Sequence, residues 1–576
     1  MSDTLLSPDK SSPSETITSV RRGLLKGRTG RKTQEAILAY ALLFPAMLII
    51  GIFGLFPLVF SVYQSTRAGL NNVVGRPDGL GQYVRAIDNL AYVLAFWVAI
   101  FFIFTGISRL YEAAKTGKKY AEKPWIWAVP GVITAVGFAQ LLRFVFIFMP
   151  GLLEIGENMR KLRLTAEERL AQFPQFLANA WAVEGVSTAF WGGLFAILLG
   201  MAIVYFFNRS PFKSRRSSIY YNAFTAGVFL LLLAGFLGWF TWSEIQLAYG
   251  EALEAGEALN IYAQLTTISA GFVLLLLSWI TWRSAAHRST NLETGLRFFA
   301  GIIFLVGGWV LIGEIPAAVA EGNKDWWQGL LNTVYYAVGS LPIQLALGLV
   351  VATLLYQDIK AKGLFRVIYF LPFITPAVGS AAVFRVIFSG NQTGIANIFL
   401  SKLGLDTIQW LNEPKGINEI IGQALNWNVP EWAAGPSLAL VVVMIYSVWR
   451  YVGYNVVFFL AGLGNISREL YEAASIDGAG RWDQFRNITI PLLSPITYFL
   501  SIFGVIGTFK AFNTIYVLRS DAALGTMDTA SVVIFDAFNR DTRYGYAAAL
   551  GIILLIIILS ASAFFDRIAK GKVFYE

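Results

Sequence analysis

The sequence predicts an all-α protein that crosses a membrane about twelve times. Of its 576 residues, 56% are hydrophobic and only 14% are charged, whereas about a quarter of the residues in a soluble domain are charged. The apolar residues fall in long runs, and the loops between these runs alternate in charge. Composition, run length and loop charge therefore all indicate a polytopic membrane protein.

Twelve apolar runs are long enough to span a bilayer, whose hydrocarbon core needs about 20 apolar residues per helix. They cover approximately residues 36–60, 88–109, 126–149, 187–207, 219–241, 262–282, 297–317, 329–356, 364–388, 436–461, 493–516 and 546–566.

Loop charge predicts the orientation, because Lys and Arg concentrate on the cytoplasmic side of a membrane. Basic residues gather in the N-terminal tail and in every second loop after it, at 115–123, 209–216, 283–297 and 360–366. The loop after the fifth run instead carries Glu244, Glu251, Glu254 and Glu257 without a basic residue. We therefore expect a multi-pass protein of the cell membrane with both termini in the cytoplasm.

Several function classes are excluded by composition. The chain has no cysteine and a single histidine, His287, which rules out disulfides, zinc sites and thiol or histidine catalysis. No catalytic or metal-ligating residue is predicted. The net charge of +9 reflects orientation in the membrane, so a nucleic-acid partner is not expected, and the bilayer itself is the first partner.

Three segments outside the apolar runs have recognisable character. Residues 1–35 are expected to form a polar cytoplasmic tail. Residues 157–180 predict an amphipathic helix on the membrane surface, opened by Thr165 with Glu168 in a capping-box pattern. The stretch 389–435 mixes turns with three tryptophans and predicts a folded cap at the interface.

The pentapeptide LYEAA occurs twice, at 110–114 and at 470–474. After the second copy, Gly478 allows the chain to leave a short helix through a left-handed conformation. A second short helix is predicted at about 481–488, ending before Pro491. Small residues on a helix-turn-helix allow the surface of a partner to approach closely.

The second copy carries a longer pattern, with the spacing E-A-A-x3-G-x9-I-x-L-P and Ile490 in place of the usual Leu. This stretch resembles the EAA loop of the membrane subunits of binding-protein-dependent ABC importers, and most closely that of the maltose-type, carbohydrate-uptake branch. We refer to residues 467–495 as the EAA loop. The resemblance implies that an ATPase subunit is contacted by Glu472, Ala473, Ala474, Asp477, Gly478, Ala479 and Pro491.

The resemblance covers about residues 329–566 and the first apolar run at 36–60, and we expect the core to comprise residues 326–576. It implies a type I ABC importer permease core of five to six helices, with about twelve transmembrane helices in all. Residues 61–325, with about six further runs, look like an insertion between the two matching parts, and no function is predicted for them.

The resemblance also implies partners. The chain lacks the G-x-x-x-x-G-K-[ST] pattern, so it has no P-loop for ATP. We expect two separate ATPase subunits that use ATP and Mg²⁺, with no cofactor bound by this chain. A second homologous permease subunit, identical or different, and an extracytoplasmic solute-binding protein complete the expected assembly in a bacterial or archaeal inner membrane.

The resemblance implies a sugar or oligosaccharide as the solute, and tyrosines suit sugars because their rings stack on a sugar while their hydroxyls form hydrogen bonds. By resemblance, the substrate path falls near Ser447, Arg450, Tyr451, Tyr454, Thr508, Lys510 and Asn513. Helix packing, or snorkelling of the long side chains to the interface, is an equally open role for each of them.

Three alternatives remain open at this stage. The added positive charge of Arg450 and Lys510 would suit a phosphorylated or acidic sugar, and the same machinery could import a polyol or a glycerophosphate. An ion-coupled secondary transporter would need carboxylates within the membrane, which the core runs almost entirely lack. The first LYEAA copy is expected to be a basic continuation of the second run, or else an accessory docking point.

Overall fold

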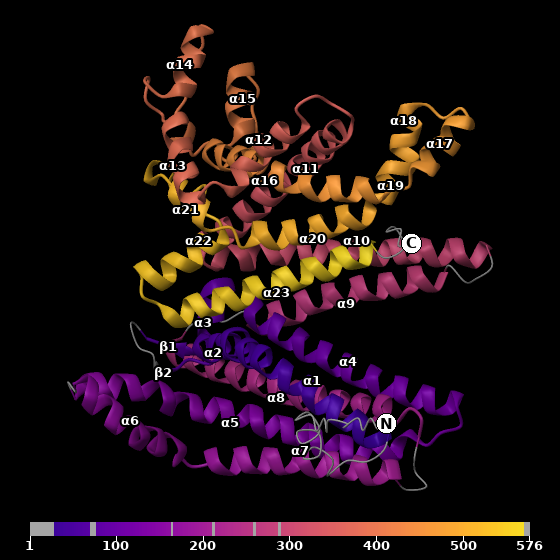
Figure 1. Cartoon of the computed structure of the whole chain (residues 1–576). Coiled ribbons are helices and arrows are strands. Elements are labelled where there is room, and N and C mark those ends of the chain that lie inside the picture. Colours follow the sequence, from indigo (N-terminus) through magenta and orange to yellow (C-terminus); the bar gives the residue numbers. More distant parts are fainter. Residues whose placement is uncertain are drawn as a thin grey trace, which may run out of the picture. The chain divides into compact units, whose positions relative to one another are not determined.

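The chain folds almost entirely into helices in a computed structural model that describes residues 28–69, 76–162, 165–209, 214–256, 261–285 and 290–569. Figure 1 shows these helices in chain order. Among the described residues, ten helices are long and apolar enough to cross a membrane, or up to twelve if each of two bent helix pairs forms one span. The predicted all-α membrane architecture is confirmed.

The chain divides into two compact units, residues 1–61 and 62–576. The first unit contains one nearly continuous helix, which runs through α1 (Arg28–Ile50), the π-helical turn η1 (Gly51–Leu55) and the start of α2 (Phe56–Ser65). Most of the predicted polar tail lies outside the described residues, but its last part, from Arg28, is helical. Lys, Arg and Gln favour helix, so the helix extends beyond the apolar run.

The region predicted to be an insertion is built mainly from long helices joined by short loops. Its elements are β1 (Arg67–Ala68), β2 (Arg76–Pro77), α3 (Gly81–Ile87), α4 (Leu90–Lys119), η2 (Pro124–Trp127), α5 (Ala128–Lys161), α6 (Ala166–Trp181), α7 (Val186–Arg209), α8 (Ser217–Ala255), α9 (Ile261–Ala285) and α10 (Thr290–Glu321). The two strands pair antiparallel, Arg67 with Pro77 and Ala68 with Arg76.

These helices form two packed groups, one of α4, α5, α7 and α8 and the other of α9 and α10. Glycine sets the closest approach of α4 and α8: a β-carbon on Gly106 would lie 2.9 Å from the carbonyl oxygen of Gly227, and one on Gly227 would lie 3.0 Å from that of Gly106. Small residues allow such backbone contact in membranes. The crossing therefore depends on the absence of a side chain at both positions.

The core is formed by the remaining elements. They are α11 (Lys324–Tyr356), α12 (Lys362–Ile374), α13 (Ala377–Ile387), α14 (Ile395–Lys402), η3 (Trp410–Asn412), α15 (Ile417–Leu425), η4 (Glu431–Ala433), α16 (Leu438–Asn465), α17 (Arg468–Ile476), α18 (Arg481–Gln484), η5 (Phe485–Thr489), α19 (Ile490–Leu492), α20 (Ser494–Phe509), α21 (Asn513–Leu518), η6 (Asp521–Ala523), α22 (Ala530–Phe535), η7 (Asp536–Arg540) and α23 (Tyr544–Ala569). Helix α11 packs against α16, α20 and α22, and α20 packs against α23.

The insertion and the core share one hydrophobic cluster. Ile87, Leu90 and Leu311 from the insertion are buried in the same cluster as Trp326 and Leu550 from the core. The expected boundary at residue 326 therefore does not separate compact units, because apolar faces of α3, α4 and α10 are covered by core helices.

The predicted span 364–388 is bent, because helices α12 and α13 meet at 93°. A second bend, of 59°, lies where the helical run 481–492 of the EAA loop meets α20. The predicted span 493–516 is wrong at its end, because α20 stops at Phe509. Side chains bind carbonyl groups at this break, since Ser531 Oγ donates to Phe509 O at 3.0 Å and Thr529 Oγ1 donates to Ala511 O at 3.2 Å.

The predicted amphipathic helix is α6, which begins at Ala166 and not near residue 157, because residues 157–161 continue α5. Its predicted capping box is present, with Thr165 N donating to Glu168 Oε2 at 2.8 Å. The segment 389–435 folds around the buried Asn397, whose amide donates to Ile408 O at 3.0 Å and accepts from Trp410 Nε1 at 2.9 Å. In Figure 1, α14 and α15 extend on the left of the core and α17 and α18 on the right.

Candidate functional site

Helix α17 of the EAA loop has a defined cap at each end. At its start, Ser467 Oγ accepts a hydrogen bond from Glu469 N at 3.3 Å. At its end, Ala479 N donates to Ala474 O at 2.9 Å and Gly478 N donates to Ser475 O at 3.1 Å. Gly478 has φ +83°, so this is a Schellman cap with glycine in the left-handed position. The predicted exit from the helix is confirmed.

Side chains hold the two short helices of the loop together. Gln484 Nε2, on α18, donates to Ser475 Oγ at 2.8 Å and to Ala479 O at 3.3 Å. The hydroxyls of Tyr471 and Thr489 lie 2.9 Å apart. These contacts fix α17 to the segment that leads back to α20, so they favour movement of the loop as one rigid unit. Sequence reasoning missed all of them, because glutamine, serine, tyrosine and threonine at these positions form no motif.

The outer surface of the EAA loop is partly apolar. Ile476 is 86% exposed and Trp482 is 68% exposed, and Ala473 between the helix caps is exposed as well. Large exposed apolar side chains beyond the membrane-spanning segments are typical of an interaction surface. A β-carbon added at Gly478 would meet no other heavy atom within 4 Å, so the turn after α17 is open to a partner.

Pro491 does not end the second short helix as predicted. The helical run continues through it to Leu492 and bends only at Leu493. The π-helical turn η5 precedes Pro491, with Ile490 N donating to Phe485 O. Proline lacks an N–H and clashes with the carbonyl four residues earlier, and the wider π turn accommodates both defects. Pro491 therefore lies in the connection between the loop and α20.

The first LYEAA copy has a different environment. Its helix, α4, continues to Lys119, and Ala113 is only 2% exposed, in a cluster with Trp127, Tyr220 and Phe224. Ala473 lies at the surface of α17, whereas the equivalent Ala113 packs α4 against its neighbours. The first copy is a continuation of the second span, as expected, although it is helical throughout. Ala113 is therefore not available for docking, whereas Ala114 is half-buried.

The residues predicted to line a substrate path lie on α16 and at the end of α20 or just after it. Ser447 accepts a hydrogen bond from Tyr336 Oη at 2.9 Å and is buried. Thr508 is also buried and donates to Val505 O at 2.9 Å. Both hydroxyls are satisfied within the helix bundle.

Arg450 lies at the bend between α12 and α13. Its Nη1 donates to Thr375 O at 2.9 Å and to Pro372 O at 3.4 Å. A guanidinium here satisfies carbonyl groups that the bend leaves without helical partners. Arg450 therefore has a positioning role at this break in the described structure.

Tyr451 and Tyr454 belong to an aromatic surface on α16. The Phe373 ring on α12 lies 6.0 Å from Tyr451 and 4.8 Å from Tyr454, between ring centroids. Tyr451 is exposed, and Tyr454 continues the surface to Phe458 at 4.9 Å. Of the predicted path residues, these two retain a surface that a sugar ring could stack on.

Lys510 and Asn513 do not bracket one helix. Lys510 caps the end of α20, and Asn513 begins α21. Both side chains are exposed in the described structure. The prediction that they share a helix is wrong, because the side-chain bonds from Thr529 and Ser531 stabilise a break after Phe509.

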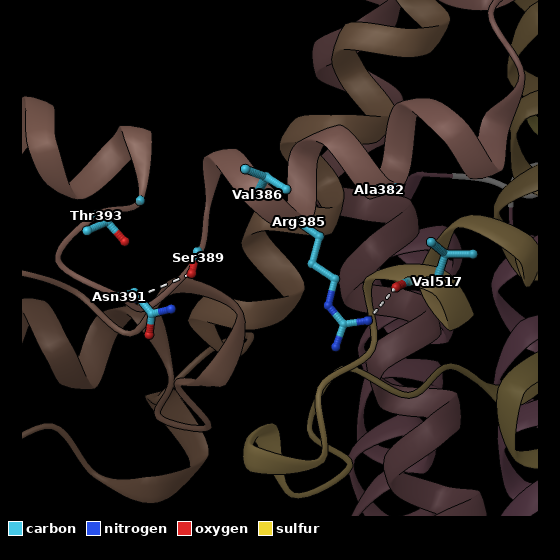
Figure 2. Close-up of a pocket in the computed structure, with 8 residues that line it drawn as sticks. Ala382, Arg385, Val386, Ser389, Asn391, Thr393 and Val517 are labelled. Carbon is cyan, nitrogen blue, oxygen red and sulfur yellow. Dashed lines mark hydrogen bonds between the residues drawn. The ribbon is translucent and has the colours of Figure 1, made fainter.

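A pocket of about 490 Å³ lies between the end of α13 and α21. Figure 2 shows Arg385 reaching from α13 toward α21, where its Nη1 lies 3.5 Å from Val517 O. The remaining lining is small or polar and consists of Ala382, Val386, Ser389, Asn391, Thr393 and Gly394. One guanidinium with hydroxyl and amide groups can form hydrogen bonds to a hydroxylated solute. Sequence reasoning did not single out this position.

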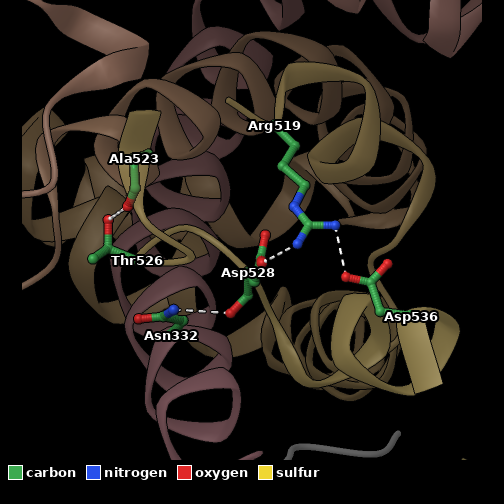
Figure 3. A network of polar contacts seen from close by, with 6 residues as sticks. All are labelled: Asn332, Arg519, Ala523, Thr526, Asp528 and Asp536. Carbon is green, nitrogen blue, oxygen red and sulfur yellow. Dashed lines mark hydrogen bonds and ion pairs between the residues drawn. The ribbon is translucent and has the colours of Figure 1, made fainter. Parts of the chain in front are cut away.

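A charged network lies in the segment between α21 and α23. Arg519 contacts Asp528 Oδ2 at 2.8 Å and Asp536 Oδ2 at 2.7 Å. Figure 3 shows Asn332 on α11 donating to the carbonyl oxygen of Asp528, at 2.8 Å. Burial raises the pKa of Asp528 to about 6, although the Arg519 guanidinium acts to lower it. The network ties this segment to the core, and no sequence pattern revealed it.

Comparison with known proteins gives a consistent result for the core. The family model of the binding-protein-dependent transport system inner membrane component matches residues 317–573. The arabinooligosaccharides transport system permease protein of Bacillus subtilis is 33% identical over 260 residues, covering 44% of this chain and 76% of that protein. The lactose transport system permease protein of Rhizobium radiobacter is 33% identical over 247 residues, covering 42% and 75%.

Two further similarities have lower identity. The trehalose/maltose transport system permease protein of Thermococcus litoralis is 28% identical over 249 residues, covering 43% of this chain and 76% of that protein. A crystal structure of a bacterial ABC transporter involved in the import of alginate matches with 22% identity and a TM-score of 0.37, over 43% of this chain and 80% of that one. The EAA loop and the candidate path residues all lie within the matched family region.

Proposed function

The chain belongs to the family of binding-protein-dependent transport system inner membrane components, and on this basis we propose that it is the permease that carries a sugar or oligosaccharide in an ATP-driven importer. Membership makes it a multi-pass subunit of an importer that works with a solute-binding protein. Its core therefore has the type I ABC importer permease architecture.

The sugar assignment is supported by the relatives. Three similar permeases are named for the transport of arabinooligosaccharides, lactose, and trehalose and maltose. The exposed ring of Tyr451 beside Tyr454 provides a surface of the kind that sugars stack on. An oligosaccharide is therefore the favoured solute. A polyol or a glycerophosphate is the alternative that a binding test has to exclude.

The braced EAA loop is the observation that carries the coupling role. It presents Ile476, Trp482 and Ala473 on an exposed surface, while Gln484 and Thr489 fix its two helices to one another. We infer that a cleft on each of two ATPase subunits receives this loop or its equivalent on a second permease subunit. Closure of the ATPase dimer would then rotate the helix bundles between inward-facing and outward-facing states.

The membrane orientation follows from the basic loops. With both termini in the cytoplasm of an inner membrane, α17 and α18 face the ATPase subunits. The 389–435 segment and the Arg519 network then face the solute-binding protein. ATP and Mg²⁺ would be used by the ATPase subunits alone, and this chain would have no catalytic step.

A substitution series at Gly478 tests the coupling role. In proteoliposomes that contain the permease subunits, the ATPase and the solute-binding protein, uptake per ATP hydrolysed is measured for Gly478→Ala and Gly478→Asn. Asparagine tolerates the left-handed conformation but adds bulk at the open turn, whereas alanine strains the turn with little bulk. If the ATPase subunit contacts Gly478 closely, Gly478→Asn should uncouple transport from ATP hydrolysis at least as strongly as Gly478→Ala. Unchanged coupling in both variants would exclude the assignment.

The solute class is tested separately. Calorimetric titration of the solute-binding protein with an arabinotriose, lactose, maltotriose and glycerol 3-phosphate series should show saturable binding of an oligosaccharide. Exclusive binding of glycerol 3-phosphate would assign the machinery to the runner-up solute. That result would leave the coupling role of the EAA loop intact.

A further inference from the structure

The cytoplasmic end of the inserted bundle is strongly basic, and the proposed transport function does not use it. Among the described residues, segments 112–125 and 214–216 together with Arg209 carry seven basic residues and two carboxylates, a net charge of +5. We name this surface the basic end. Its cations are Lys115, Lys118, Lys119, Lys123, Arg209, Arg215 and Arg216, and its carboxylates are Glu112 and Glu122.

Packing brings the two segments to one place. The Arg216 guanidinium lies 3.3 Å from the centre of the Tyr120 ring. Glu122 accepts hydrogen bonds from Tyr220 Oη at 2.7 Å and from Ser214 Oγ at 2.9 Å. On the other side, the Phe207 ring of α7 lies 5.9 Å from Trp127, which places Arg209 at the same end of the bundle.

Three lysines of α4 form the centre of the surface. Lys115, Lys118 and Lys119 have i, i+3 and i+4 spacing, so they lie on one helical face. All three are exposed, and none forms an ion pair with a carboxylate among the described residues. Glu122 pairs with Arg216 at 3.7 Å instead. The positive charge of this face is therefore not neutralised within the described part of the chain.

Exposed aromatic rings surround the same end. Tyr111 is 67% exposed and Trp125 is 62% exposed, and both lie at ends of helices that are long and apolar enough to span. Tyrosine and tryptophan are enriched at the level of lipid headgroups, with their rings in the interface. The lysines and the rings thus lie where a phospholipid phosphate and its glycerol region would be.

We propose that the basic end is a binding site for the headgroups of anionic phospholipids. The phosphates would lie on the α4 lysines and Arg209, while the tyrosine and tryptophan rings contact the upper acyl chains. Clusters of four to eight Lys or Arg at the cytoplasmic end of a membrane helix are typical of such recognition. The site would hold this end of α4 at the headgroups of the inner leaflet.

The test is a lipid titration of the full-length chain. Purified protein is delipidated and titrated with phosphatidylglycerol or phosphatidylcholine of the same acyl chains, and bound lipid is counted by native mass spectrometry. Wild type should prefer phosphatidylglycerol. The triple variant Lys115→Gln, Lys118→Gln, Lys119→Gln should lose affinity for phosphatidylglycerol on the order of tenfold to a hundredfold, with phosphatidylcholine binding unchanged.

Matched variants separate charge from position. The triple Lys→Arg variant should keep the preference for phosphatidylglycerol. Lys360→Gln, which removes an exposed lysine from a loop of the core, should keep it as well.

Basic loops also direct membrane insertion, so the topology of each variant has to be checked. Glu167→Cys introduces a single cysteine into this cysteine-free chain, and this cysteine on α6 should remain accessible from outside. If the triple variant inserts wrongly, Lys123→Gln with Arg209→Gln leaves the α4 lysines intact and should give an intermediate loss.

Three results would overturn the proposal. Equal affinity of wild type for both lipids would show that headgroup charge is not recognised. Unaltered phosphatidylglycerol binding in correctly inserted Lys→Gln variants would place the site elsewhere. Displacement of phosphatidylglycerol by millimolar inorganic phosphate would show a site for soluble anions instead.

Discussion

Gln484 Nε2 donates a hydrogen bond to Ser475 Oγ at 2.8 Å, across the turn of the EAA loop. This contact joins a helix that presents its surface to a partner with the segment that leads back into the membrane. If the EAA loop has the proposed coupling role, this contact lets a displacement of α17 move α20 instead of bending the loop.

Replacing Gln484 with Ala should lower the amount of solute transported per ATP several-fold, with little loss of thermal stability. Gln484 makes two hydrogen bonds, to Ser475 and to Ala479 O, and a partly exposed hydrogen bond contributes only about 1 kcal/mol to stability. Uptake and ATP hydrolysis are measured together in proteoliposomes. Ser475→Ala removes one of the two bonds and should have the smaller effect. An unchanged transport ratio in Gln484→Ala would mean that the brace is not needed.

The two LYEAA copies should respond in opposite ways to the same substitution. Ala113→Leu adds volume in a closed cluster beside Tyr220 and Trp127, and overpacking of this kind typically costs about 1–3 kcal/mol. Ala473→Leu adds volume on an exposed helix surface, so the melting temperature should hardly change while ATP-coupled uptake falls. Thermal melting and uptake of both variants check this. A loss of uptake without a loss of stability in Ala113→Leu would assign a docking role to the first copy.

Arg450→Gln should lower both stability and transport, because it removes charge-assisted hydrogen bonds to Thr375 O and Pro372 O at the bend between α12 and α13. Bonds of this kind contribute about 1.5–3 kcal/mol. Arg450→Lys should recover part of the stability, since an ammonium can reach one carbonyl. Lys360→Gln, on an exposed side chain outside the candidate path, serves as the control. Altered solute preference with unaltered stability in Arg450→Gln would instead place Arg450 in the substrate path.

The stability of the segment around Asp528 should rise as the pH falls from 7 to 5. Burial raises the pKa of Asp528 from 3.8 to about 6, so the folded state binds the proton more tightly than the unfolded state. The stabilisation is complete below the unfolded pKa and is lost as the pH rises through the folded pKa. Allowing for screening by solvent, the effect is on the order of 1 kcal/mol.

Asp528→Asn isolates this contribution. The melting temperature of wild type, relative to that of the variant, should rise as the pH falls from 7 to 5. The variant keeps both Asp536 and Arg519, which lie 2.7 Å apart in the wild-type structure. Melting curves at both pH values check the sign. A constant difference would mean that Asp528 does not titrate in this range.

The sequence by itself determined the membrane character, the number and order of the apolar runs, the helix cap at Gly478 and the family of the core. These features depend on local chemistry: run length, loop charge, and the left-handed conformation that glycine adopts. The capping box of α6 was predictable for the same reason, because Thr165 and Glu168 are only three residues apart.

Only the tertiary structure decided how those elements are used. It buried Ala113 and exposed Ala473 within identical pentapeptides, because α4 packs this alanine against other helices whereas α17 leaves it at the surface. It turned Arg450 toward the carbonyl groups of a helix bend, ended α20 at Phe509, and joined Arg519 to Asp528 and Asp536. Each of these outcomes depends on groups far apart in the chain, whose distances no local pattern records.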